Sequence, residues 1–375
     1  MFRYTFRSDE VDVHLAGESV IDGLCLGGIR VASGISEATL TTLARLMSLK
    51  FAVAGIPLGG AKSAVVVRPG FSRKVAIERA ARALEPFLRS QYLVGVDSGS
   101  SPDDVISIYR TAGVDPTELV AEKTRARGKT LALPDGLRFE QLMDNDFSGA
   151  LTGVGLSHAL DTAASLVQYT LAGRRASVQG FGNVGHAAAV ALTAKGIKVV
   201  ALSDVHGVVY RPKGFSAEFL AGARAGQGDI DRTALPEGTR LLPSQSWCEL
   251  PAEILVPAAT ARCLTERNAK TVHQDVRFVV EGANDPVTVG AERLFEGRGI
   301  TVLPDFVANS GLAIAFGLLV TGESTVESVG DEYLRRIETS VRACVPSEAT
   351  AATYVRDRAE SHARRYLASI RDRTF

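Results

Sequence analysis

The sequence predicts an α/β protein built from two domains. Three observations lead there: the length of 375 residues, an alternation of short apolar runs with helical patterns after residue 149, and a more polar texture around 121–148. A chain of this length suggests two domains, and alternating strands and helices imply a parallel sheet covered by helices. We place the boundary in the polar stretch, which gives domains at 1–148 and 149–327. Charged, amphipathic helices at about 328–375 are expected to complete the first domain.

The bulk composition is that of an average globular protein. The chain is 46% hydrophobic and 22% charged, and 42 basic residues balance 42 acidic ones. A net charge of zero provides no field that would draw the protein to nucleic acid or to a membrane surface. The longest nearly apolar run, 306–320, is short for a membrane span, and the N-terminus lacks a signal-peptide core. We therefore expect no nucleic-acid or membrane partner and a cytoplasmic location.

The four cysteines also fit a reducing compartment. They are far apart and form no CxxC pair. Free thiols are therefore expected, and no metal site.

The first domain shows alternating helices and strands. A helix is expected over 36–54, where Ser36 can cap the first turn and apolar residues recur at spacings of three and four. A strand at 64–67 ends at an Arg-Pro-Gly turn. A helix over 72–89 and a strand over 92–96 follow.

The second domain repeats a strand–helix pattern. Its first helices are expected at 149–169 and 184–195, and its strands at 176–180, 197–203, 252–256, 276–280 and 300–303. This order favours a parallel sheet with helices on both faces.

The motif GFGNVG at 180–185 predicts a dinucleotide-binding turn. It follows a short strand and opens an alanine-rich helix. Gly180 permits the tight turn, Gly182 lets the backbone approach a pyrophosphate, and Gly185 lets helix and strand pack closely. The free N–H groups of the helix then face the phosphate charge. The alternative is a tight strand–helix turn that binds no nucleotide.

An acidic residue follows at the distance that such a site requires. Asp204 ends the next strand about 20 residues after the glycines, where an acid binds the ribose hydroxyls of NAD. A carboxylate there would repel the 2′-phosphate of NADP. Arg211 and Lys213 lie downstream and could soften this preference, so NADP is not excluded.

Two lysines stand in the most glycine-rich apolar stretch of the chain. Lys50 interrupts a hydrophobic helical stripe, and Lys62 lies in what we interpret as a glycine turn at 57–63. Desolvation is costly for an ammonium and lowers its pKa, which makes a lysine usable in acid–base chemistry. Asp97 follows a predicted strand. Each residue alone can be a surface lysine or a turn cap, but the three together, near the glycine pairs 27–28 and 59–60, favour a site.

At this point the sequence resembles the glutamate/leucine/phenylalanine/valine dehydrogenases. The resemblance covers most of the chain and rests on nine segments in the family's order: LGGIR (26–30), LMSLK (46–50), PLGGAK (57–62), GVD (95–97), LTG (151–153), GFGNVG (180–185), PAA (257–259), EGAN (281–284) and PDFVANSG (304–311).

The resemblance implies a two-domain, oligomeric enzyme. An N-terminal α/β substrate domain and a Rossmann-type dinucleotide-binding domain would be separated by a cleft. The enzyme would catalyse reversible, NAD(P)-linked oxidative deamination of an L-amino acid to a 2-oxo acid and ammonia. By the same resemblance, Lys50 binds the substrate α-carboxylate, Lys62 activates water and Asp97 shuttles protons. Gly27 and Gly28 belong to the substrate site. The positions implied for the cofactor are Thr152, Gly180, Phe181, Gly182, Asn183, Val184, Asp204, Ala258, Ala259, Asn284 and Asn309, the last near the substrate too.

The side-chain pocket looks apolar. Glutamate-type members carry a lysine at the position of Leu26 and a serine at that of Phe316, so both polar handles are missing here. Burying an unpaired carboxylate against them would be costly. We therefore expect an apolar amino acid, with Leu26, Gly95, Ala313 and Phe316 lining the pocket.

Three other readings stay open. The segment after Asn309 has Leu312 in place of a family glycine, which admits a specialised amino acid of secondary metabolism. A glutamate-type or NADP-linked reaction is the second. The third is a nucleotide-binding relative without dehydrogenase activity, against which the intact Lys50, Lys62 and Asp97 argue.

Overall fold

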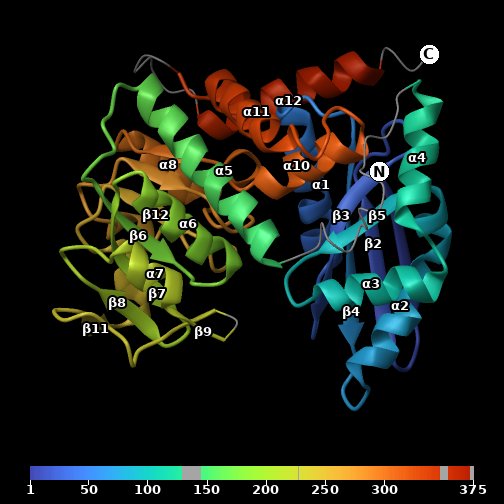
Figure 1. Cartoon of the computed structure of the whole chain (residues 1–375), viewed down its shortest axis with the longest axis horizontal. Helices are drawn as coiled ribbons and strands as arrows, with labels where there is room; N and C mark the ends of the chain where they lie inside the picture. Colours follow the sequence, from blue (N-terminus) through green and yellow to red (C-terminus); the bar gives the residue numbers. More distant parts are fainter. Residues whose placement is uncertain (129–144, 227, 347–353, 372–375) are drawn as a thin grey trace. The chain divides into compact units, whose positions relative to one another are not determined.

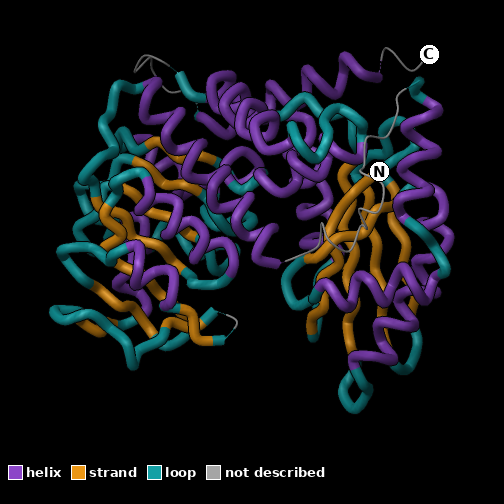
Figure 2. The backbone as a smooth tube through the Cα atoms, viewed as in Figure 1, coloured by secondary structure: helices purple, strands orange, loops and turns teal. Residues whose placement is uncertain are grey.

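The computed structural model describes residues 1–128, 145–226, 228–346 and 354–371. Contacts between Cα atoms divide the chain into two compact units. Figure 1 gives the element labels, and Figure 2 shows that the strands of each unit lie together, with helices and loops around them. Unit 1 comprises Met1–Phe147, Ala313–Glu332 and Ala363–Phe375, and unit 2 comprises Ser148–Leu312 and Tyr333–His362.

Unit 1 contains a five-stranded sheet in the order β1-β2-β4-β3-β5. Strand β3 runs parallel to both β4 and β5, whereas β1 and β2 are antiparallel. The sequence analysis did not predict β1, β2 or β3, because glycines dilute the β-propensity of β3 and the alternation in β1 is short. The strands are β1 (Phe2–Arg7), β2 (Val11–Gly17), β3 (Cys25–Ala32), β4 (Gly59–Val67) and β5 (Tyr92–Val96).

The interpretation of 57–63 as a glycine turn was wrong, because β4 begins at Gly59 and Lys62 lies inside the strand. These glycines serve close packing. A Cβ atom at Gly59 would come within 2.1 Å of the Ser19 carbonyl oxygen, and one at Gly60 within 2.1 Å of the Ser48 backbone nitrogen. Only glycine lets the neighbouring backbone approach this strand so closely.

Helices cover this sheet. The Ser36 side chain accepts a hydrogen bond from the Thr39 N–H and caps the first helix, as predicted. This helix packs on β4, and the next two pack side by side. The helices are α1 (Glu37–Val53), α2 (Arg73–Ser90), α3 (Pro102–Ala112) and α4 (Pro116–Ala126).

Unit 2 contains a seven-stranded sheet in the order β11-β8-β7-β6-β12-β13-β14. The five strands from β7 to β14 are parallel, and β8 and β11 add an antiparallel edge. The predicted parallel α/β sheet is confirmed. Its strands are β6 (Arg175–Gln179), β7 (Lys198–Asp204), β8 (Gly207–Tyr210), β11 (Arg240–Leu242), β12 (Ile254–Pro257), β13 (Phe278–Val280) and β14 (Thr301–Leu303).

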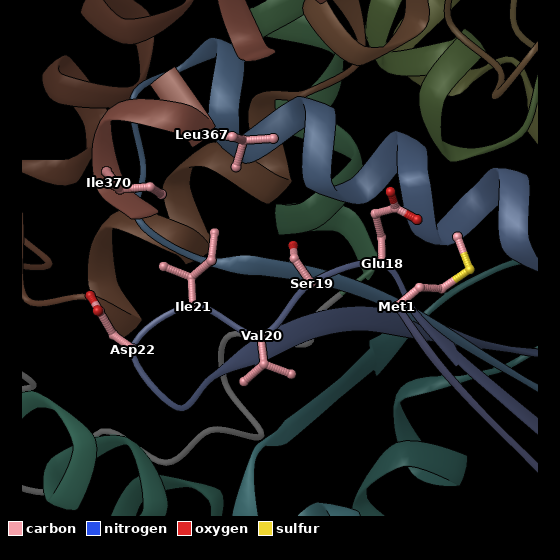
Figure 3. A pocket seen from close by; sticks show the side chains of 8 residues that line it. All are labelled: Met1, Glu18, Ser19, Val20, Ile21, Asp22, Leu367 and Ile370. Carbon is pink, nitrogen blue, oxygen red and sulfur yellow. The ribbon is translucent and has the colours of Figure 1, made fainter. Parts of the chain in front are cut away.

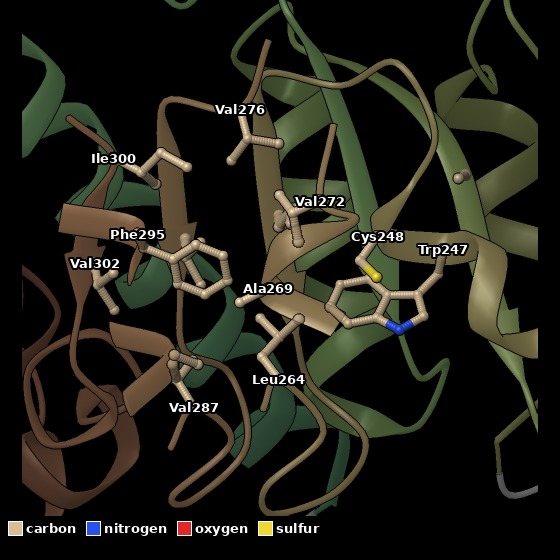
Figure 4. Close-up of a cluster of buried hydrophobic side chains, with 14 of the residues drawn as sticks. Trp247, Cys248, Leu264, Ala269, Val272, Val276, Val287, Phe295, Ile300 and Val302 are labelled. Carbon is tan, nitrogen blue, oxygen red and sulfur yellow. The ribbon is translucent and has the colours of Figure 1, made fainter. Parts of the chain in front are cut away.

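A separate two-stranded hairpin, β9 (Arg224–Ala225) with β10 (Asp229–Ile230), follows helix α7 (Ala217–Gly222). The other helices of this region are α5 (Asn145–Leu166), α6 (Asn183–Ala194), α8 (Val289–Gly297) and α9 (Asp305–Ala308), with short 3₁₀ turns at Ser244–Cys248 and Asn268–Lys270. A buried cluster that includes Trp247, Leu264 and Phe295 packs beside the sheet (Figure 4).

The C-terminal part differs from the expected arrangement. It forms α10 (Gly311–Val320), α11 (Val329–Cys344) and α12 (Val355–Arg371). Residues 333–362, which we expected to complete the first domain, group with unit 2. The physical reason is the Arg356 side chain on α12, which is held at 2.8 Å by both Glu281 and Glu292 of unit 2. Within the described part of the chain, no helix is both long and apolar enough to span a membrane.

Candidate functional site

Lys62 and Asp97 form a buried ion pair. The Lys62 Nζ atom lies 3.0 Å from Asp97 Oδ2, and the two side chains are 5% and 12% exposed. Lys62 comes from β4 and Asp97 follows β5, so the pair spans the intervening strand β3. The sequence pattern placed the two residues near one another, and the structure brings them into direct contact.

The glycine pair of β3 makes this contact possible. A Cβ atom at Gly27 would come within 1.7 Å of the Ala61 carbonyl oxygen, next to Lys62. A Cβ atom at Gly28 would come within 2.8 Å of the Asp97 Cβ atom. Side chains at either position would push β4 or Asp97 away, so the glycines allow the pair to close across β3.

Arg30 is a member of the cluster that the sequence analysis missed. Its Nε atom donates to the same Oδ2 atom of Asp97 at 3.1 Å. Burial raises the pKa of Asp97, but the charges of Lys62 and Arg30 outweigh that effect and leave the pKa below its usual range. The position of Arg30 in the LGGIR motif was the available signal, since it lies near the end of the strand that carries both glycines.

The other predicted substrate residues also lie in unit 1. Lys50 is in the last turn of α1 and is 7% exposed. Leu26 and Gly95 lie on the paired strands β3 and β5, and Gly95 is opposite Gly28. Phe316 is buried on α10, which also carries Ala313. Helix α10 packs closely against α1: a Cβ atom at Gly317 would lie 3.3 Å from the Phe51 side chain.

The glycine-rich turn has the geometry that the motif predicts. Gly180 has a φ of 87°, and a Cβ atom at Gly185 would come within 2.0 Å of the Gly180 carbonyl oxygen. By contrast, a Cβ atom at Gly182 would meet nothing within 4 Å, and no side chain caps the N-terminus of α6 there. Open space in front of uncapped N–H groups is what an entering phosphate requires.

Further predicted cofactor residues gather at the carboxyl ends of β6, β12 and β13. A Cβ atom at Gly180 would lie 2.9 Å from Ala259, and one at Gly282 would lie 2.8 Å from the Ala258 Cβ atom. Asn284 follows Gly282 by two residues. In doubly wound sheets, ligands bind at these strand ends, where the strand order reverses.

Asn309 presents an unsatisfied acceptor. Its Nδ2 atom donates to the carbonyl oxygens of Gly282 at 3.1 Å and Ala283 at 2.9 Å. Its Oδ1 atom is buried and has no hydrogen-bond partner. A buried orphan acceptor is unfavourable unless a ligand satisfies it, and the carboxamide of a nicotinamide is a suitable donor. With the open glycine turn, this atom indicates that the residues present fit a dinucleotide.

The remaining predicted cofactor positions contribute in different ways. Thr152 is buried on α5, while Asn183 and Val184 begin α6. The Phe181 side chain is buried against His186 at 5.2 Å between ring centroids, which leaves its backbone as the part available to a ligand.

The Asp204 carboxylate is occupied from within the protein. It accepts hydrogen bonds from Arg232 and from the backbone N–H groups of His206 and Ile230. Burial raises the pKa of Asp204, and the Arg232 hydrogen bonds with the two N–H groups lower it further than burial raises it. No sequence pattern pointed to Arg232, which lies 28 residues away.

Two other features stand outside these clusters. A hollow in unit 1 contains none of the predicted residues and is lined by Met1, Glu18, Ser19, Val20, Ile21, Asp22, Leu367 and Ile370 (Figure 3). Among the residues that the structure describes, no group of three or more His, Cys, Asp or Glu side chains is arranged to hold a metal ion.

Comparison with known proteins gives two family matches. The model described as "Glutamate/Leucine/Phenylalanine/Valine dehydrogenase" matches residues 147–370. The model "Glu/Leu/Phe/Val dehydrogenase, dimerisation domain" matches residues 19–111.

Individual proteins show the same relationship. The glutamate dehydrogenase of Aeropyrum pernix is 32% identical over 285 residues, and the NADP(+)-dependent glutamate dehydrogenase of Pyrobaculum calidifontis is 34% identical over 291 residues. Each match covers 76% of this chain and 66% of the relative, slightly less than two thirds of its length. A crystal structure of hetero-hexameric glutamate dehydrogenase from Thermus thermophilus, in a Leu-bound form, aligns with a TM-score of 0.76 at 25% identity, covering 96% of this chain and 84% of that one.

Proposed function

Because the chain belongs to the glutamate/leucine/phenylalanine/valine dehydrogenase family, we propose that it is an amino-acid dehydrogenase. It catalyses the reversible, NAD(P)-linked oxidative deamination of an L-amino acid to its 2-oxo acid and ammonia. The observation that carries this proposal is the buried contact of 3.0 Å between Lys62 and Asp97.

The two residues divide the proton chemistry. A bound NAD(P) would supply the acceptor for the hydride of the substrate Cα atom, and the substrate would thereby become an imine. Lys62 activates the water that attacks this imine carbon. Asp97, held ionised by Lys62 and Arg30, takes protons from the amine and returns them to the departing ammonia. Lys50 binds the α-carboxylate and orients the Cα atom.

We assign the substrate residues to unit 1 and the cofactor residues to unit 2. Lys50, Lys62 and Asp97 all belong to the first. The open turn at Gly182 and the orphan acceptor of Asn309 belong to the second. These two features support placing the pyrophosphate at the N-terminus of α6 and the nicotinamide carboxamide near Asn309.

The side chain that the enzyme prefers is apolar in this proposal. Leu26 and Phe316 are both 7% exposed and offer no polar atom to a carboxylate. An unpaired carboxylate against such residues loses its hydration without compensation. Glutamate is the second candidate substrate, because the relatives are named glutamate dehydrogenase. A specialised apolar amino acid would still belong to the first candidate class, the apolar amino acids.

Association of identical subunits is part of the proposal. The match to a model named for dimerisation, at residues 19–111, supports it.

A substrate panel tests the reaction. We expect reduction of NAD(P) at alkaline pH with leucine, valine, phenylalanine or an apolar analogue, and much less with glutamate. Lys62→Ala should lower kcat at least a hundredfold, about the contribution of a general acid–base group. Lys74→Ala, at an exposed position on α2, is the matched control and should keep full activity.

Each contrary result has a distinct meaning. Full activity of Lys62→Ala would overturn the mechanism. Faster turnover of glutamate than of any apolar amino acid would overturn the substrate class alone. Dinucleotide binding without turnover of any amino acid would favour a non-catalytic relative.

A further inference from the structure

A hairpin with an arginine at each end lies next to the dinucleotide-binding turn. We call residues 224–226 and 228–232 the arginine hairpin, after Arg224 and Arg232 at its ends. Its strands pair Arg224 with Ile230, and its Gly228 approaches the turn so closely that a Cβ atom there would lie 3.7 Å from Gly182. Arg224 donates to the Asn183 side chain at 2.9 Å, at the start of α6. The hairpin therefore reaches the region where the phosphates of a dinucleotide are expected.

Arg232, at the end of this hairpin, occupies the Asp204 carboxylate that was predicted to bind the ribose. Arg232 grips the Asp204 carboxylate with both terminal nitrogens, at 2.5 and 2.6 Å. The N–H groups of Ile230 and His206 donate to the same carboxylate at 2.8 Å each. Four donors use the carboxylate's four lone-pair sites, so little acceptor capacity is left for ribose hydroxyls.

The side chains of Asp204 and Arg232 differ in solvent exposure. The Asp204 side chain is 1% exposed, whereas the Arg232 side chain is 26% exposed. An approaching ribose therefore meets the guanidinium before it meets the carboxylate. Of the five N–H donors of the arginine, two bind Asp204 and one reaches the Ile230 carbonyl oxygen at 3.2 Å, which leaves two.

The charges around this subsite also cancel. The negative charge that would repel a 2′-phosphate is paired with Arg232, and Arg224 adds a second positive charge near the turn. The carboxylates of Asp229 and Asp231, on the same hairpin, oppose the two arginines. An isolated Asp204 would disfavour NADP, but this carboxylate is paired with Arg232.

We propose that Arg232, rather than Asp204, contacts the 2′ position of the adenosine ribose, and that this chain binds the 2′-phosphate of NADP. Asp204 is a positioning residue that holds the guanidinium in place. An arginine beside the ribose is a known way to accommodate a 2′-phosphate. The inference rests on the proposed function only in that the chain binds a nicotinamide dinucleotide.

Calorimetric titration with ADP-ribose and with its 2′-phosphate tests the inference without any amino-acid turnover. We expect the wild-type protein to bind the 2′-phosphorylated ligand at least as tightly as ADP-ribose. Arg232→Met should weaken binding of the 2′-phosphorylated ligand at least tenfold and change ADP-ribose binding less than threefold. Arg232→Lys should restore part of the loss, because it keeps the charge without the bidentate grip. Asp204→Asn should leave ADP-ribose binding within threefold of wild type.

The control is Arg240→Met. Arg240 is an exposed arginine of the same sheet on β11, two strands away from β7, and its replacement should change neither affinity. Thermal unfolding of each variant verifies that the hairpin substitutions leave the protein folded.

Other results would overturn the inference. A wild-type preference for ADP-ribose of a hundredfold or more would do so, as would an unchanged ligand ratio in Arg232→Met. A tenfold loss of ADP-ribose binding in Asp204→Asn would return the ribose to the carboxylate. Each of these results would still be consistent with a dinucleotide site. If the protein bound neither ligand, the proposed function would be overturned as well.

Discussion

At the scale of single residues, Asp97 shows how a buried carboxylate stays ionised. Isolation from water favours its neutral form, and two cations reverse that preference. Both cations address the same carboxylate oxygen, Oδ2, and the backbone of Ser98 adds a hydrogen bond to the carboxylate. Arg30 therefore shares with Lys62 the task of keeping the proposed proton shuttle charged.

Replacement of Arg30 should shift the pH dependence of the reaction. In Arg30→Met the pKa of Asp97 rises because one of its two cations is lost, so the acidic limb of kcat/KM should move to higher pH. We expect the loss of activity to be confined to acidic pH, where protonation of Asp97 competes, and Arg30→Lys to recover part of it. Steady-state kinetics across pH provide the measurement.

A surface arginine provides the control for that experiment. Arg68 pairs with Asp12 and is 43% exposed, so Arg68→Met should leave the profile unchanged. An acidic limb that stays in place in Arg30→Met would show that Lys62 alone sets the charge of Asp97.

At the scale of elements, glycines decide how strands and helices meet. Gly27 and Gly28 let β3 pass between Lys62 and Asp97, and Gly185 lets α6 pack against the end of β6. Gly182, in the same motif, faces open space. The motif therefore contains one glycine that the fold requires and another that the packing does not require, which we assign to the proposed cofactor.

Two alanine variants should separate these roles. Gly185→Ala should destabilise the protein by about 2–3 kcal/mol, because its Cβ atom would press on the Gly180 carbonyl oxygen. Gly182→Ala should unfold like the wild type but bind dinucleotide at least tenfold more weakly. Urea unfolding and ligand titration measure the two effects. Equal stability of both variants would contradict the packing argument.

At the scale of the whole molecule, a buried charge network fixes the C-terminal part of unit 2. Arg356 contacts Glu281 and Glu292 at 2.8 Å and Asp305 at 3.5 Å. One cation among three acids cannot compensate all of them. Burial and the neighbouring acids accordingly raise the pKa of Glu281 to about 8, although Arg356 opposes the shift.

The network should make stability depend on pH. The folded pKa of Glu281 lies above its unfolded value of about 4.3, so the folded protein binds the extra proton between these values. The contribution of Glu281 to stability is full below about pH 4 and is lost as the pH rises to about 8. Glu281→Gln should remove this part of the slope, as measured by urea unfolding across pH. If the Glu281 side chain instead made the protein less stable as the pH falls from about 8 to about 4, the raised pKa of Glu281 would be contradicted.

The sequence by itself predicted the fold class, the parallel sheet of the second domain and most residues of the two clusters, but not Arg30 or Arg232. These follow from local signals: hydrophobic periodicity, helix caps and glycines at fixed offsets from a strand. It did not reveal β1 to β3, the true place of Lys62 in a strand or the grouping of 333–362 with unit 2.

Only the tertiary structure decided which charged side chains form ion pairs. The ion pairs of Asp97 with Arg30, of Asp204 with Arg232 and of Glu281 with Arg356 join residues 67, 28 and 75 positions apart. Partners at such separations leave no periodic trace in the sequence, because strand order and loop folding alone bring them together. Those pairings set the charges at the proposed proton shuttle and ribose subsite.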